Sequence, residues 1–151
     1  MLRCIILFAA LLAAFSFPSG KALALDEQQG ASIKAIWAKE LPADRNGEAV
    51  VLDSSEPQVR IALVATRPVH DLTLLGLEFE NISDEGKLSF KTQTLHKYAE
   101  LKPEHPLIIV MTFYGSIPSY GFSYRDADGA VRRFAIQESG KDGSLELVAF
   151  E

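Results

Sequence analysis

The sequence predicts an all-β fold, an antiparallel β-sandwich of seven to nine strands preceded by a signal peptide. Apolar residues recur at every second position in several short segments, turn-forming residues separate these segments, and the N-terminus is basic, then apolar, then rich in small residues. Period-two alternation lets a strand bury one face and expose the other. Short strands at regular spacing are typical of a sandwich or a barrel.

Residues 1–24 are interpreted as the signal peptide. Arg3 supplies a basic start, Cys4–Phe17 contains no charged residue, and Ala22 and Ala24 place small residues around the expected cleavage point. A retained membrane anchor is the alternative, but this apolar run of about 14 residues is short of the roughly 20 that a spanning helix needs. We therefore expect cleavage after Ala24 and a periplasmic or secreted protein without stable membrane insertion.

Charge and cysteine content limit the mature chain. Removal of Arg3 and Lys21 with the signal peptide leaves 13 basic and 20 acidic residues. An acidic domain repels nucleic acid and anionic membranes, so neither is expected as a partner. Cys4, the single cysteine, leaves with the signal peptide, so the mature domain must fold without disulfides.

Nine segments of the mature chain have strand character. One phase change near Leu74 and Leu75 predicts a β-bulge, and residues 98–101 are interpreted as a possible helical turn. Residues 68–71 are interpreted as a turn. The expected strands are 32–38, 48–52, 58–66, 71–80, 87–94, 107–114, 120–125, 130–137 and 145–150.

Two segments carry the strongest signals. Leu107–Tyr114 is apolar on almost every position, which predicts a central strand covered on both faces. Asp126–Gly129 ends in a glycine that can adopt positive φ, which predicts a tight hairpin. An immunoglobulin-like or fibronectin-like sandwich fits the length and strand number, with residues 25–31 as a flexible tether and 32–151 as one domain.

The sequence contains no complete catalytic or metal-binding motif. No serine lies in a nucleophile-elbow pattern, and His70 and Asp71 are adjacent, so on a strand they would point to opposite faces. The mature histidines lack metal-ligand spacing, and Asp126 and Asp128 match only the start of a calcium loop. We expect no cofactor, no metal and no catalytic residue.

The segment from Phe113 to Tyr124 contains three of the four tyrosines among Gly, Ser and Pro. Tyrosine beside glycine and serine is typical of binding loops, because a rigid aromatic side chain supplies contact area at low entropic cost. The alternative is that these aromatics belong to the core and the loop only connects strands. If the segment binds a ligand, the expected contact residues are Tyr114, Ser116, Ile117, Ser119 and Tyr120.

These patterns predict an exported, non-enzymatic binding module whose partner is an unknown protein or glycan. Two alternatives remain open. The first is a small exported hydrolase that uses His70, Asp71 or the scattered carboxylates, which would place His70 in a concave pocket with a serine or carboxylate within hydrogen-bond reach. The second is a structural subunit of an envelope complex, which would carry a long apolar patch or an unpaired edge strand.

Overall fold

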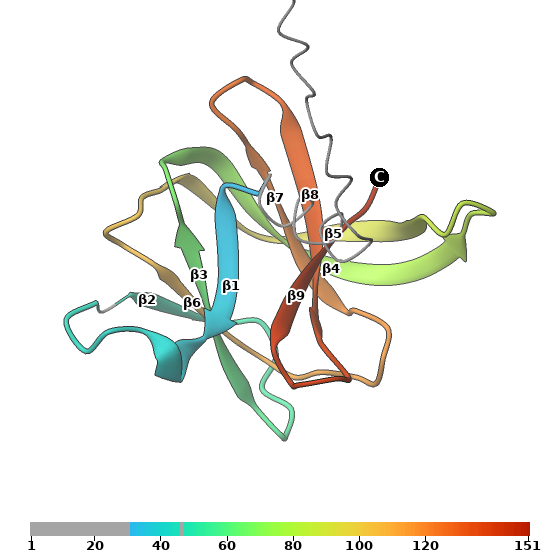
Figure 1. Ribbon diagram of the computed structural model, residues 1–151, viewed down its shortest axis with the longest axis horizontal. Helices are drawn as coiled ribbons and strands as arrows, with labels where there is room; N and C mark the ends of the chain where they lie inside the picture. Colours follow the sequence, from blue (N-terminus) through green and yellow to red (C-terminus); the bar gives the residue numbers. More distant parts are fainter. Residues whose placement is uncertain (1–30, 46) are drawn as a thin grey trace, which may run out of the picture.

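The computed structural model describes residues 31–45 and 47–151. They form two β-sheets packed as a sandwich, with a single turn of 3-10 helix (Figure 1). The predicted signal peptide and residues 25–30 of the predicted tether lie outside the described residues. The elements are β1 (Ile33–Trp37), η1 (Ala38–Glu40), β2 (Glu48–Val51), β3 (Val59–Ala65), β4 (Val69–Ile82), β5 (Leu88–Leu101), β6 (Leu107–Met111), β7 (Tyr120–Arg125), β8 (Val131–Glu138) and β9 (Leu145–Ala149).

The smaller sheet has the strand order β1-β3-β6-β2, and the larger sheet has the order β5-β4-β7-β8-β9. All neighbouring strands are antiparallel except β2 and β6, which are parallel. In Figure 1 the distal half of the β4–β5 hairpin projects to the right, beyond the smaller sheet. None of the described helical residues forms a helix long and apolar enough to cross a membrane.

The main core lies between the sheets and follows the predicted alternation. Alternate residues of β3 face it, and the prediction that β6 is covered on both faces is confirmed because every residue of that strand is buried. Phe122 and Tyr124 of β7 are fully buried and stack within this core. The aromatics at these two positions are therefore core residues, as the alternative interpretation of the tyrosine-rich segment required.

The predicted bulge in β4 is confirmed by a register shift between Leu74 and Leu75. Leu72 and Leu74 face the main core, whereas Leu75 and Leu77 pack in a second apolar cluster on the other face of the larger sheet. Phe90 and Phe150 meet edge to face in that cluster, with ring centroids 5.2 Å apart. The bulge thus allows one long strand to contribute to two apolar clusters.

Two local predictions are wrong. Residues 98–101 are not helical but continue β5, because Tyr98 pairs with Leu72 and Leu101 with Val69. Residues 69–71 are the start of β4 rather than a turn. In both cases pairing along a long hairpin stabilises the extended conformation and outweighs the weak local signal.

The predicted hairpin at Asp126–Gly129 is confirmed. Gly129 has φ +82°, and its amide donates to the Asp126 carbonyl at 2.9 Å. The Asp126 carboxylate, which is buried, accepts from Ser32 Oγ at 2.9 Å and from Arg132 Nε at 3.0 Å. These contacts join the beginning of β1 to the larger sheet.

Candidate functional site

The loop between β6 and β7, residues 112–119, begins at an anchored threonine. The buried Thr112 hydroxyl donates to the carbonyl oxygens of Ser55 and Pro57, at 2.7 and 3.1 Å. Gly115 then adopts φ +73°, a conformation that favours glycine because it has no Cβ. The loop is therefore held at its start against residues 53–57, which follow β2.

Asp53 is the centre of a cluster that we call the Asp53–tyrosine cluster: Asp53, Tyr114 and Tyr120. The hydroxyls of Tyr114 and Tyr120 both donate to Asp53 Oδ2, at 2.5 and 2.7 Å. The other carboxylate oxygen accepts from the Ser55 amide at 2.8 Å. Both rings are thus fixed at their polar ends.

The contacts within the cluster lower the pKa of Asp53 and raise the pKa of Tyr120. The hydrogen bond from Tyr114, followed by those from the Ser55 amide and Tyr120, holds the pKa of the Asp53 carboxyl well below its usual range. Burial raises the pKa of Tyr120, and its hydrogen bond to Asp53 and the charge of that carboxylate raise it further. The ground state at neutral pH is therefore an ionised Asp53 carboxylate that accepts a hydrogen bond from the protonated Tyr120 hydroxyl.

A cavity of about 650 Å³ lies beside this cluster. Tyr120 on β7 and side chains of β5 line it from either side of β4, so β5 forms the wall opposite the tyrosines. Its lining combines apolar, amide, hydroxyl and charged side chains. The lining residues are Leu52, Gly76, Leu77, Glu78, Lys91, Thr92, Gln93, Leu95, Tyr114, Ser119 and Tyr120.

Gly76 explains why the cavity exists. It pairs with Tyr120 on β7 and with Gln93 on β5, so these three positions form one row across the sheet. A Cβ at Gly76 would meet Leu95 and Gln93 only at 3.7 Å or more, which is ordinary van der Waals contact. The space above Gly76 is therefore open because glycine has no side chain, and a larger residue would extend into it.

Of the five contact residues that the sequence predicts, three line the cavity and two do not. Tyr114, Ser119 and Tyr120 line the cavity, and the Ser119 carbonyl also accepts from the Leu77 amide at 2.8 Å. Ser116 and Ile117 are exposed on the loop but do not line the cavity. Ile117 is 50% exposed.

Sequence reasoning missed Asp53, Gly76 and the β5 wall of the cavity. Asp53 lies 61 residues before Tyr114, and no local pattern links the two positions. A glycine within an alternating strand was the one available signal for Gly76, since such a residue often marks a close approach or an open space.

The His70 and Asp71 pair does not form a triad-like arrangement among the described residues. Both side chains are exposed, and Asp71 has φ +51°. The Asp71 carboxylate accepts from Arg125 Nε at 3.2 Å, and no hydrogen bond in the described part of the chain joins His70 to a serine. Nothing in this geometry favours the hydrolase alternative.

Residues 31–45 and 47–151 contain no group of three or more His, Cys, Asp or Glu side chains that could hold a metal ion. The candidate calcium turn uses its main carboxylate elsewhere. Asp126 lies 3.0 Å from Arg132 and 3.5 Å from Arg67, so its charge is already compensated.

The edge of the larger sheet has features that discourage sheet extension. β5 is an outer strand of that sheet in the described structure. Leu95 has no register partner on β4, and Lys91 and Lys97 lie exposed on either side of this irregularity. Bulges and lysines are common devices that prevent edge-to-edge pairing. This edge therefore gives little support to the structural-subunit alternative.

Comparison with protein-family models, with curated proteins and with solved structures finds no match for this chain.

Proposed function

We propose that this protein is a non-catalytic binding module that holds an oligosaccharide in the cavity beside the Asp53–tyrosine cluster. The observation that carries the proposal is the convergence of two tyrosine hydroxyls on one carboxylate at the cavity wall. The immunoglobulin-like type of the sandwich and export to the periplasm or the medium are parts of the same proposal. A two-sheet fold and the N-terminal sequence pattern support them.

A sugar fits the chemistry of this cavity better than an apolar ligand. A pyranose ring has an apolar face that can lie on a tyrosine ring, and its rim of hydroxyls needs hydrogen-bond partners. Tyr114 is 51% exposed, so its ring is accessible, while its hydroxyl is held by Asp53. Gln93, Lys91 and Glu78 offer donors and acceptors on the opposite wall. Pre-ordered aromatic rings reduce the entropic cost of binding.

The first experiment is a titration of the isotope-labelled protein with soluble oligosaccharides of glucose, galactose and N-acetylglucosamine, followed by NMR. We expect amide shifts in residues 91–95 and 114–120 for at least one sugar. Shifts produced only by short blocked peptides would replace the sugar by a polypeptide ligand. Absence of any shift at these positions with both probe sets would overturn the proposed site.

Two substitutions separate binding from folding. Gly76→Val should narrow the cavity and weaken sugar binding while the melting temperature is preserved, because valine suits a strand and a Cβ at this position makes only ordinary van der Waals contacts. Tyr114→Ala removes the exposed ring and should weaken binding about tenfold, or about 1.4 kcal/mol. Val131→Ala, at an exposed apolar position on β8, is the matched control and should bind as the parent protein does.

Localisation requires its own test. We expect the mature protein in the periplasmic or extracellular fraction, with an N-terminus at Leu25. A chain of full length recovered from the cytoplasm would contradict export without bearing on the sugar site.

A further inference from the structure

A second groove, of about 650 Å³, lies on the outer face of the smaller sheet, away from the tyrosines. The groove arises from the order of the strands in this sheet. β1 and β2 are the two edges of that sheet, and the described residues 38–45 and 47 lie between these two strands in the chain. On the way, Leu41 and Pro42 approach Ile108, which is almost completely buried although it points away from the main core.

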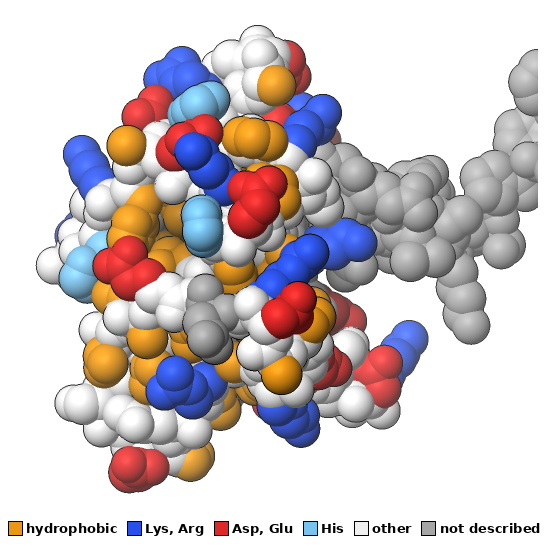
Figure 2. All heavy atoms as spheres, turned by 90° about the vertical axis from the view of Figure 1, so that its left-hand side faces the viewer, with side chains coloured by type: hydrophobic (Ala, Val, Ile, Leu, Met, Phe, Trp, Pro, Cys, Tyr) orange, Lys and Arg blue, Asp and Glu red, His pale blue; other side chains and the backbone are white. Residues whose placement is uncertain are grey.

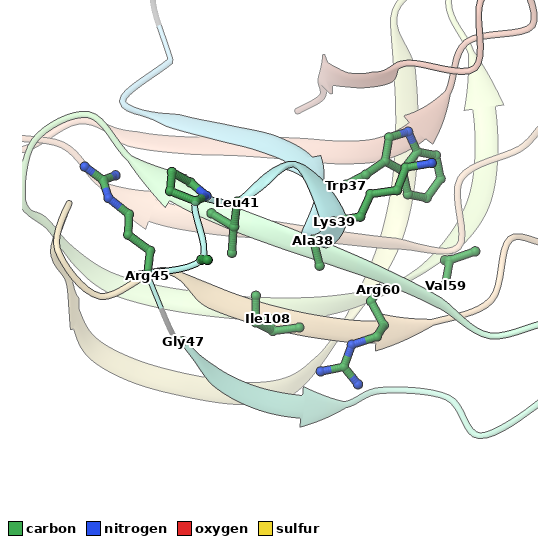
Figure 3. A pocket seen from close by; sticks show the side chains of 11 residues that line it. Trp37, Ala38, Lys39, Leu41, Arg45, Gly47, Val59, Arg60 and Ile108 are labelled. Carbon is green, nitrogen blue, oxygen red and sulfur yellow. The ribbon is translucent and has the colours of Figure 1, made fainter.

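The groove has an apolar base and a cationic border. Ala38, Leu41, Val59 and Ile108 form its apolar part, and Figure 3 shows Ile108 below Ala38 and Leu41, between Arg45 and Arg60. The charged side chains of Lys39, Arg45 and Arg60 surround this part on different sides and come from three different segments (Figure 3). On the side of the molecule shown in Figure 2, apolar side chains reach the surface next to lysine and arginine side chains.

The charge of the groove is opposite to that of the whole protein. The chain has a net charge of −5, yet the groove is lined by three cations and no carboxylate. None of the ion pairs formed within the described residues involves Lys39, Arg45 or Arg60. Cations that are left without partners around an apolar surface favour a ligand that carries several negative charges and an apolar side chain.

We propose that this groove docks an acidic polypeptide segment of a partner protein, with carboxylates against Lys39, Arg45 and Arg60 and an apolar side chain against Ile108. The separation of the cations favours a polypeptide. An anionic lipid has one charged end and would satisfy one cation, whereas an extended peptide with Glu, Leu and Glu at every second position presents carboxylates on both sides of an apolar group on one face. The docking site is independent of the sugar-binding cavity.

Trp37 lines the groove and is the one tryptophan of the chain, so its fluorescence can report occupancy. The probe, called the Glu–Leu peptide, is a blocked octapeptide in which Glu and Leu take turns at every second position with Gly between them, so that both side-chain types share one face of the extended chain. Octaglutamate and the same peptide with Lys in place of Glu (the Lys–Leu octapeptide) serve for comparison. We expect a saturable change in Trp37 emission with the Glu–Leu peptide alone, weaker at high ionic strength. Equal binding of either comparison peptide would overturn the proposal.

Charge reversal provides the decisive variants. Arg60→Glu and Lys39→Glu, both at exposed positions, should weaken the Glu–Leu peptide at least about tenfold. Lys97→Glu makes the same charge change on exposed β5 and is the matched control, expected to bind within about twofold of the parent. Equal affinity of Arg60→Glu and Lys97→Glu would overturn the proposal.

Two further outcomes identify other occupants. Concentration-dependent self-association that Arg60→Glu abolishes, without peptide binding, would assign the groove to a second copy of the chain. Binding of dodecanoate but not of the peptide would assign it to an anionic lipid. Either result overturns the polypeptide assignment. Gly76→Val should leave peptide binding unchanged, which separates failure here from failure of the sugar site.

Discussion

Two carboxylates in this protein, Asp53 and Asp126, each accept hydrogen bonds from a backbone amide and from at least one side-chain hydroxyl, yet they differ in burial and in nearby charge. Asp126 is buried between the start of β1 and the β7–β8 hairpin, and two arginines compensate its charge. Asp53 lies at the surface beside a cavity, and its side-chain partners are two tyrosines, with no ion pair to a cation among the described residues. Both have a lowered pKa, but for different physical reasons.

This difference in burial and charge indicates that Asp126 stabilises the fold, whereas Asp53 orders the two tyrosine rings. Burial alone would raise the pKa of Asp126, and hydrogen bonds from the Ala127 amide, Ser32 and Arg132, together with the charge of Arg67, outweigh that effect. Such a group is coupled to folding. The pKa of Asp53 is lowered mainly by hydroxyl groups that it orders, so its removal changes ring positions more than the fold. The substitutions below test this contrast.

The largest effect is expected for Asp126→Ala. It leaves Ser32 and the Ala127 amide without their acceptor and removes the charge that Arg132 faces, which should destabilise the fold by about 3 kcal/mol. Urea unfolding measures this. Asp128→Ala, in the same turn but exposed, should cost less than about 1 kcal/mol. Equal losses of unfolding free energy in the two variants would mean that Asp126 contributes no more to stability than an exposed carboxylate does.

The contribution of Asp126 should depend on pH. Its pKa is lowered in the folded state, so its stabilisation is complete above the unfolded pKa of about 3.9 and is lost as the pH falls through the folded value. The stability difference between the parent protein and Asp126→Asn should therefore shrink as the pH falls below about 4. A difference that stays constant down to acid unfolding would contradict the assignment.

Tyr124→Phe should have an intermediate effect. The Tyr124 hydroxyl accepts from the Ser32 amide at 2.9 Å inside the core, and its loss leaves that amide without an acceptor while the ring packing remains. We expect destabilisation of about 1 kcal/mol. Hydrogen exchange of the Ser32 amide should become faster than in the parent, and unchanged exchange there would argue against this hydrogen bond.

The smallest effect on unfolding is expected for Asp53→Asn, because the site is at the surface and the rings keep their neighbours. Its effect should be visible instead in the tyrosine titration. The pKa of Tyr120 should fall when the carboxylate charge is removed, yet stay above 10 because burial remains. Ultraviolet absorbance of phenolate follows this change. A large loss of stability with no change in tyrosine titration would contradict this prediction, because it would mean that Asp53 stabilises the fold and does not control the tyrosine hydroxyls.

The sequence by itself determined the features that depend on neighbouring residues. Alternation in 59–65 and 107–111 set which side chains face the core, the phase change at Leu74 and Leu75 located the bulge, and Gly129 located the hairpin. These are properties of one strand or one turn, because side-chain direction and backbone conformation are local.

Tertiary structure alone decided the chemistry. Asp53 meets Tyr120 across 67 residues, Ser32 meets Asp126 across 94, and the cationic groove forms because the chain joins opposite edges of a sheet. The order of strands brings such residues together, and local alternation is compatible with many strand orders. The same pairing extended β5 through residues 98–101, where the local signal was too weak to indicate a strand.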